Sequence, residues 1–133
     1  MSQENVEIVR RGHDAFNRRD KAGWIAVCDP NAENFPPREW PESTLVRGAE
    51  AIWEFFIEAQ EMFEHGSFEL DELIEANPDK VVGHQRRQMR GKASGAAIDW
   101  NYWIVFTLRN GMVARIDWFA DRAEALKAVG LEE

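Results

Sequence analysis

The spacing of hydrophobic positions changes once along this chain. Up to about residue 65, apolar side chains recur every three or four positions, which is typical of helices with one buried face. From residue 67 to 119 they alternate with polar ones, which is typical of strands. The pattern therefore predicts an α+β domain, with helices first, then strands, then a short helix. The predicted helices span 2–19, 21–28, 48–65 and 122–128, and the predicted strands span 67–76, 80–91, 96–108 and 112–119.

Residues with a preference for helix ends set the limits of these helices. Ser2, Asp20 and Asp121 are the predicted N-caps, and Glu124 completes a capping box with Asp121. Residues 30–47 contain all but one of the five prolines and show little periodicity. We interpret them as a wrapping loop with room for one short strand.

The Arg-Asn-Gly turn at 109–111 decides which residues of the last two strands face each other. A two-residue Asn-Gly loop would place Ile104 on the same face as Asp117. A three-residue loop, with Gly111 as the bulge residue, pairs Ile104 with Ile116 instead. Because a one-residue slip exchanges the two faces of a strand, the hydrophobic pattern favours the three-residue loop.

In this register the predicted sheet has one apolar face and one polar face. The apolar face must pack on the helices. It carries Val81, Gly83, Gln85, Arg87, Met89, Ile98, Trp100, Tyr102, Ile104, Phe106, Leu108, Ala114, Ile116 and Trp118. The polar face also carries Trp103, Val105 and Phe119, and apolar residues of this kind on an outer surface indicate an interface. We therefore expect a homodimer formed through these three residues.

Composition and charge narrow the class of protein. The 133 residues suit one domain over 1–133, and 44% of them are hydrophobic. The net charge of −8 argues against binding nucleic acid or an anionic membrane surface. The polar start of the chain has no apolar signal region, and no apolar run approaches about 20 residues, so we expect a cytoplasmic protein. The single cysteine, Cys28, has apolar neighbours and is interpreted as a buried thiol.

Short motifs follow one another along nearly the whole chain. They are Glu4-Asn5-Val6, Ala15-Phe16-Asn17 with Asp20, Asp29-Pro30, Val46-Arg47-Gly48 with Ala51-Ile52, Gly91 with Ser94-Gly95, 106–111 and 121–126. Their order and spacing resemble the nuclear transport factor 2-like superfamily, and more closely its SnoaL-like, ketosteroid-isomerase-related branch. The resemblance implies a cone-shaped fold, with a strongly curved, mostly antiparallel sheet packed on N-terminal helices around a hydrophobic pocket, frequently in a homodimer. It leaves the activity open, because the superfamily includes isomerases, polyketide-type cyclases, dehydratases, epoxide hydrolases and non-enzymatic binders.

The resemblance also allows a test for steroid isomerisation. That reaction uses a carboxylate base, a tyrosine and a protonated carboxylic acid. Aligned with the family, these positions fall at Pro36, Gly12 and Ile104, and none of the three can transfer a proton. Isomerisation by that set of residues is therefore not expected. A shift within the loop offers only Glu33 or Glu39 as a base.

Polar residues on the predicted inner surface are the remaining candidates for chemistry. His13 lies on the apolar stripe of the first helix and is either a general acid or base, or a partly buried histidine bonded to a loop carbonyl. Arg87 either binds a ligand carboxylate or enolate, or stacks on Trp100 and reaches solvent or a carboxylate of the third helix. Gln85, opposite Tyr102, is either a ligand clamp or half of a structural pair.

The candidate site therefore combines one catalytic candidate with a set of binding candidates. The catalytic candidate is His13, and the ligand-binding candidates are Gln85, Arg87, Trp100, Tyr102, Ile104, Phe106, Ile116 and Trp118. Simple core packing is the alternative for each aromatic residue. No metal site is expected, because the three histidines fall on different elements, and no phosphate-binding loop or other cofactor motif is present.

Two functions remain open at this point. The chain is either a cofactor-independent isomerase, cyclase or lyase that acts on a hydrophobic carbonyl compound, or a non-catalytic binder of an apolar or aromatic metabolite. A dry pocket that perturbs the pKa of His13 would favour the enzyme. A wholly apolar cavity would favour the binder, and a solid core would exclude both.

Overall fold

The computed structural model describes residues 2–37 and 45–131, and it confirms the predicted α+β class. Its elements are α1 (Ser2–Asn17), α2 (Lys21–Ala26), β1 (Cys28–Phe35), β2 (Val46–Arg47), α3 (Ala49–Gln60), β3 (Glu69–Ala76), β4 (Lys80–Arg90), β5 (Ala97–Arg109), β6 (Met112–Phe119) and α4 (Arg122–Ala128). Six strands form one sheet in the order β2-β1-β6-β5-β4-β3. All neighbouring strands are antiparallel except β1 and β6, which are parallel. The side chain of Ser2 and the candidate base Glu39 lie outside the described part of the chain.

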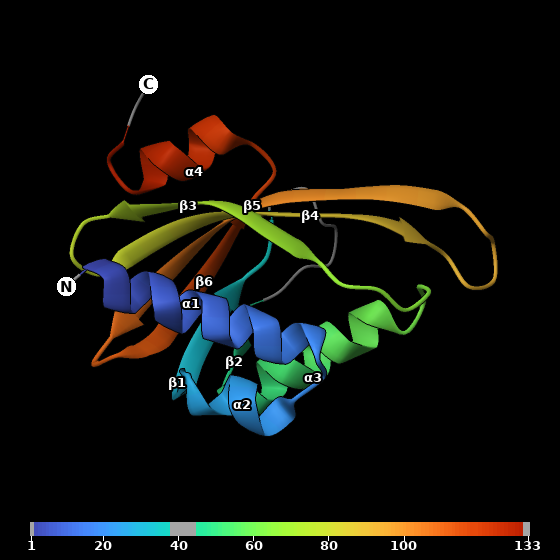
Figure 1. Cartoon of the computed structure of the whole chain (residues 1–133), viewed down its shortest axis with the longest axis horizontal. Coiled ribbons are helices and arrows are strands. Elements are labelled where there is room, and N and C mark those ends of the chain that lie inside the picture. The colour runs from blue at the N-terminus through green and yellow to red at the C-terminus, as the bar shows by residue number, and fades with distance from the viewer. Residues whose placement is uncertain (1, 38–44, 132–133) are drawn as a thin grey trace.

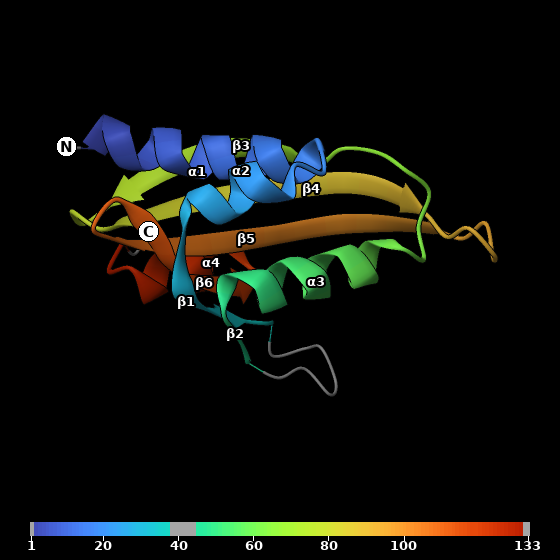
Figure 2. The same ribbon diagram turned by 90° about the horizontal axis from the view of Figure 1, so that it is seen from below.

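The helices form two layers, one on each face of the sheet. The N-terminal helices α1, α2 and α3 lie on one side, and α4 lies on the other (Figures 1 and 2). The main core lies between the N-terminal helices and the sheet, where Phe16 and Ile52 pack in one cluster with Ile104 and Ile116. The sheet face that was predicted to be apolar is thus the face that meets these helices.

The segment that was predicted as a loop contains a strand. β1 lies next to β6 in parallel orientation, with Asn34 beside Ile116. The pairing is irregular around Pro30, which has no N–H to donate to a neighbouring strand. The prediction allowed one short strand in this segment, and the structure has the eight-residue β1 and the two-residue β2. The partner β6 comes from near the other end of the chain, so the local pattern did not place β1. The predicted helix 21–28 accordingly ends early, at Ala26.

The turn between β5 and β6 also differs from the prediction. Asn110 and Gly111 both have positive φ angles, of 54° and 74°, and they form a two-residue hairpin loop. The pairing then skips Ala114, which forms a bulge in β6. We had predicted the extra residue in the loop, but it lies in the strand.

This bulge changes the register but preserves the apolar face. Ile104 lies beside Trp118 and not beside Ile116 as predicted. Trp118 and Ile116 both still face the helices, because a shift of two residues keeps a strand's side chains on the same face. Val113, predicted on the outer face, instead belongs to the main core cluster.

The third helix is shorter than predicted, because the residues after it join the sheet's longest hairpin. α3 ends at Gln60 and not at residue 65. The backbone N–H of Lys92 donates to the carbonyl of Met62 at 2.9 Å, and that of Glu64 donates to the carbonyl of Arg90 at 2.9 Å. The β4–β5 hairpin projects past the end of α3 (Figure 1). Its backbone therefore holds residues 62–64 by hydrogen bonds.

The outer face of the sheet is covered by the chain's own last helix. Asp121 caps α4 as predicted, with its side chain accepting from the N–H of Ala123 at 2.9 Å. α4 packs on Trp103 and Val105, which are 7% and 3% exposed. These residues are buried without a second subunit, and the homodimer through Trp103, Val105 and Phe119 stays a prediction. None of the described helices combines the length and the apolar character needed to cross a membrane.

Candidate functional site

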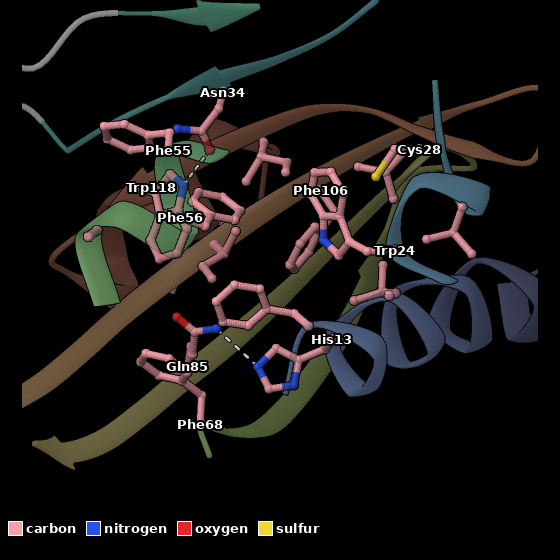
Figure 3. A pocket seen from close by; sticks show the side chains of 18 of the residues that line it. His13, Trp24, Cys28, Asn34, Phe55, Phe56, Phe68, Gln85, Phe106 and Trp118 are labelled. Carbon is pink, nitrogen blue, oxygen red and sulfur yellow. Dashed lines mark hydrogen bonds between the residues drawn. The ribbon is translucent and has the colours of Figure 1, made fainter. Parts of the chain in front are cut away.

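A cavity of about 70 Å³ lies between the N-terminal helices and the inner face of the sheet (Figure 3). Pockets for drug-sized ligands measure roughly 300–1,000 Å³, so this cavity suits a compact group, and a polycyclic ligand requires side chains to move. The lining residues are Ile8, Val9, Gly12, His13, Phe16, Trp24, Val27, Cys28, Asn34, Phe55, Phe56, Ala59, Gln60, Phe68, Gln85, Trp100, Ile104, Phe106, Val113, Ile116 and Trp118.

Three polar side chains on the cavity wall form a hydrogen-bonded chain that fixes the tautomer of His13. The indole N–H of Trp100 donates to Gln85 Oε1 at 2.9 Å, and Gln85 Nε2 lies 3.0 Å from His13 Nε2 (Figure 3). An indole can only donate, so the amide oxygen must face Trp100 and the amide nitrogen must face His13. His13 Nε2 therefore accepts, and the imidazole is neutral with its proton on Nδ1.

The burial of His13 acts in the same direction as this hydrogen bond. Desolvation lowers the pKa of His13 from 6.5 to about 4, against a smaller opposing effect of the neighbouring Asp14. At neutral pH the ring is uncharged, and protonation at Nε2 would also break the bond from Gln85. The cavity thus contains a histidine that is held in one tautomer and one charge state.

A second amide–indole pair lies on the other side of the cavity. Trp118 Nε1 donates to Asn34 Oδ1 at 2.7 Å, and Asn34 is 1% exposed (Figure 3). Asn34 comes from β1, so this strand brings a polar group into the site. Ala32 and Asn34 are alternate buried residues of β1, but one of them is polar, so no apolar alternation in the sequence indicated that Asn34 faces inward.

Aromatic rings from the three N-terminal helices close the cavity. Phe16 of α1 meets Trp53 and Phe56 of α3 edge to face, with ring centroids 5.8 Å apart in each pair. Trp24 of α2 meets Phe56 in the same manner at 6.0 Å. Phe56 also contacts Trp118 of the sheet at 5.9 Å. Such mutual contacts hold the rings in fixed positions and make most of the cavity wall apolar.

The positions of the isomerase residues explain why that chemistry does not fit. At Gly12, even an added Cβ would lie 3.0 Å from Cγ2 of Val27, so a tyrosine there would require repacking. Glu33 does not line the cavity and pairs with Arg47, with Nη2 and Oε2 2.6 Å apart. No carboxylate lines the cavity in the described part of the chain. Burial raises the pKa of the Cys28 thiol to about 12, so it stays protonated, as the prediction of a buried thiol implies.

The structure brings most of the predicted site residues together. His13, Gln85, Trp100, Ile104, Phe106, Ile116 and Trp118 all line the cavity. Tyr102 and Arg87 do not. Tyr102 packs against Trp100 with ring centroids 4.8 Å apart, and Arg87 stacks on Phe68 instead of Trp100. Among the residues that the structure describes, no cluster of three or more His, Cys, Asp or Glu could hold a metal ion.

Comparison with known proteins identifies the family. Residues 9–116 match the model of the SnoaL-like domain, and the chain belongs to this family. No match was found among curated protein sequences.

Solved structures show the same fold over nearly the full chain. An NTF2-like protein from Burkholderia xenovorans LB400 is 27% identical, with 98% of each chain covered and a TM-score of 0.76. Bal32a, from a soil-derived mobile gene cassette, is 27% identical, with 88% of each chain covered and a TM-score of 0.73. A ketosteroid isomerase-like protein from Erwinia carotovora atroseptica SCRI1043 is 18% identical, with 89% of this chain and 94% of that chain covered and a TM-score of 0.67. The chain is thus similar in fold to the proteins that the motifs of its sequence resemble.

Proposed function

We propose that this chain binds a compact hydrophobic carbonyl compound in its cavity and moves a proton on it, as an isomerase or cyclase that needs no cofactor. The observation that carries this proposal is the hydrogen-bonded chain of Trp100, Gln85 and His13, which holds one neutral imidazole on the wall of a largely aromatic cavity. The family and the isomerase-like fold relative favour the same class of reaction.

His13 is the group that would carry the proton. When the ligand displaces the Gln85 amide from Nε2, the freed lone pair would take a proton from the carbon next to the carbonyl, so that a C–H bond breaks, an N–H bond forms and the electron pair moves to the carbonyl oxygen. The N–H of Gln85 that this releases would donate to the resulting enolate oxygen. The imidazolium, with a pKa of about 4, would return its proton readily to another carbon.

Proton exchange in D₂O tests this role directly. We expect the wild type to bind methyl 4-oxo-4-phenylbutanoate, an uncharged ketone with one ring, and to exchange its α-protons for deuterium, as measured by proton NMR. His13→Gln should reduce the exchange rate by about a hundredfold, the lower range for a general base, with little change in binding. The matched control, His65→Gln, changes an exposed histidine outside the cavity and should retain the wild-type rate.

A non-catalytic binder is the second candidate. It is favoured by the absence of a carboxylate among the described lining residues and by the bond that already engages His13 Nε2. Binding by quenching of tryptophan fluorescence, without any exchange above the buffer rate, would establish this alternative. Absence of both binding and exchange for a series of single-ring ketones would refute both functions.

A further inference from the structure

Two partly buried arginines lie beside the aromatic wall of the cavity. The guanidinium carbon of Arg19 lies 4.8 Å from the ring centroid of Phe16, and that of Arg87 lies 5.2 Å from the ring centroid of Phe68. Both rings line the cavity, and their centroids are 6.0 Å apart. Two positive charges are therefore held on neighbouring rings of one part of the wall.

Neither of these two arginines has an acidic partner in the described part of the chain. Arg19 Nη1 donates to the backbone carbonyl of Phe16 at 2.8 Å. Arg87 donates to the backbone carbonyl of Glu64 and, at 3.4 Å, to Gln60 Oε1. All of these acceptors are uncharged, and each guanidinium has five N–H groups, so several donors remain for a further acceptor.

The third partly buried arginine in the described part of the chain has the acidic partner that Arg19 and Arg87 lack. Arg122 pairs with Glu72, with Nε and Oε2 3.0 Å apart. The chain contains 24 acidic residues and 16 basic ones, so a carboxylate partner is easily supplied. Burial, together with the charge of Arg19, lowers the pKa of Arg87. An anion bound between the two guanidinium groups would relieve this repulsion.

Arg87 lies at the border between the cavity and solvent. It lines an open, polar hollow of about 580 Å³ on the outside, while Phe68 and Gln60, which it contacts, line the cavity. Gly66 leaves space for the guanidinium, because an added Cβ there would lie 2.7 Å from Arg87 Nη2. A ligand with its apolar end in the cavity could thus present a polar end to Arg87.

We propose that Arg19 and Arg87 bind a carboxylate group of the ligand, and that the ligand is a hydrophobic acid whose apolar end occupies the cavity. Guanidinium groups suit this role, since they form charge-assisted and often bidentate hydrogen bonds with carboxylates. This inference rests on the proposed function, because it concerns the ligand of the same cavity. It adds the charge of that ligand and the residues that select it.

A matched pair of ligands tests the inference separately from the proposed function. The pair is 4-oxo-4-phenylbutanoate and its methyl ester, which share the ring and the ketone and differ in charge. Dissociation constants are measured by calorimetry for the wild type, Arg19→Gln, Arg87→Gln and the double variant. Arg90→Gln serves as the control, because it removes an exposed charge from the same outer hollow without a contact to the cavity wall.

We expect the wild type to bind the acid at least tenfold more tightly than the ester, as charge-assisted hydrogen bonds predict. The preference should fall to within about twofold in the double variant and decrease with added salt, while ester binding and the preference of Arg90→Gln stay unchanged. Circular dichroism confirms that each variant is folded, and either single variant suffices if the double variant is not.

Two results would overturn the inference while leaving the proposed function intact: equal binding of acid and ester by the wild type, or a preference that persists without both arginines. If the wild type binds neither compound, the cavity does not take this class of ligand, and the proposed function fails together with the inference.

Discussion

Two histidines on opposite faces of the sheet show how differently one fold can treat the same side chain. His13, on the inner side, receives a hydrogen bond from the Gln85 amide on the wall of a largely apolar cavity. His84, on the outer side, has Nδ1 3.0 Å from Asp71 Oδ1 and Nε2 2.5 Å from Asn101 Oδ1. The partner of His13 is thus an amide N–H, whereas both nitrogens of His84 face side-chain oxygens.

The two histidine rings also differ in the side chains that pack against them. His84 stacks on Trp103, with centroids 4.2 Å apart and an interplanar angle of 7°. This arrangement fastens β3, β4 and β5 together at the outer surface. The comparison teaches that the fold keeps the inner histidine neutral beside a cavity, while the outer one connects neighbouring strands through its hydrogen bonds and its stacking.

The largest effect is expected from removing the amide that connects His13 and Trp100. Gln85→Leu would remove the hydrogen bonds of this amide to two partly buried side chains, at a cost of about 1–3 kcal/mol each. We expect the free energy of unfolding, measured with urea, to fall by about 2–4 kcal/mol. Gln88→Leu, on an exposed position of the same strand, is the control and should change it by less than about 0.5 kcal/mol. If both changes lowered the free energy of unfolding equally, the hydrogen bonds of Gln85 to His13 and Trp100 would have no particular importance for stability.

The second largest effect is expected on the pH dependence of the free energy of unfolding. Because the pKa of His13 in the folded chain, about 4, is lower than its ordinary value of 6.5, the unfolded chain binds a proton that the folded chain excludes between these two pH values. This histidine's contribution to stability is therefore complete above pH 6.5 and is lost as the pH falls towards 4, by up to about 3 kcal/mol.

Urea unfolding at a series of pH values would measure this loss, with His13→Gln as the reference that removes only this titration. The difference in unfolding free energy between wild type and variant should change across this pH range. A constant difference from pH 7 to 4 would mean that His13 titrates normally.

The smallest effect is expected on the outer face. His84→Gln would remove the stack on Trp103 and weaken the bonds to Asp71 and Asn101 at a partly exposed site, at a cost of about 1 kcal/mol. His65→Gln, at an exposed position, provides the baseline in the same thermal unfolding experiment. A loss as large as that of Gln85→Leu would show that the outer cluster contributes as much to stability as the hydrogen-bonded chain of the cavity.

Much of this molecule follows from its sequence, because local patterns decide it. The alternation of apolar residues placed Gln85 opposite Tyr102, and the structure confirms this pair. The same pattern put six of the eight candidate ligand-binding residues of the sheet on the wall of the cavity. Periodicity suffices here, since a strand's side chains alternate strictly and its apolar face must meet the helices.

Only the tertiary structure decided the rest, because it depends on contacts between distant segments. β1 becomes a strand by pairing with β6, which brings Asn34 to Trp118. The bulge at Ala114 lies in β6 because both strands must keep their apolar faces on one core, which a turn sequence alone does not encode. The charge state of His13 likewise depends on burial and on the donor-only indole of Trp100, which reaches it through Gln85.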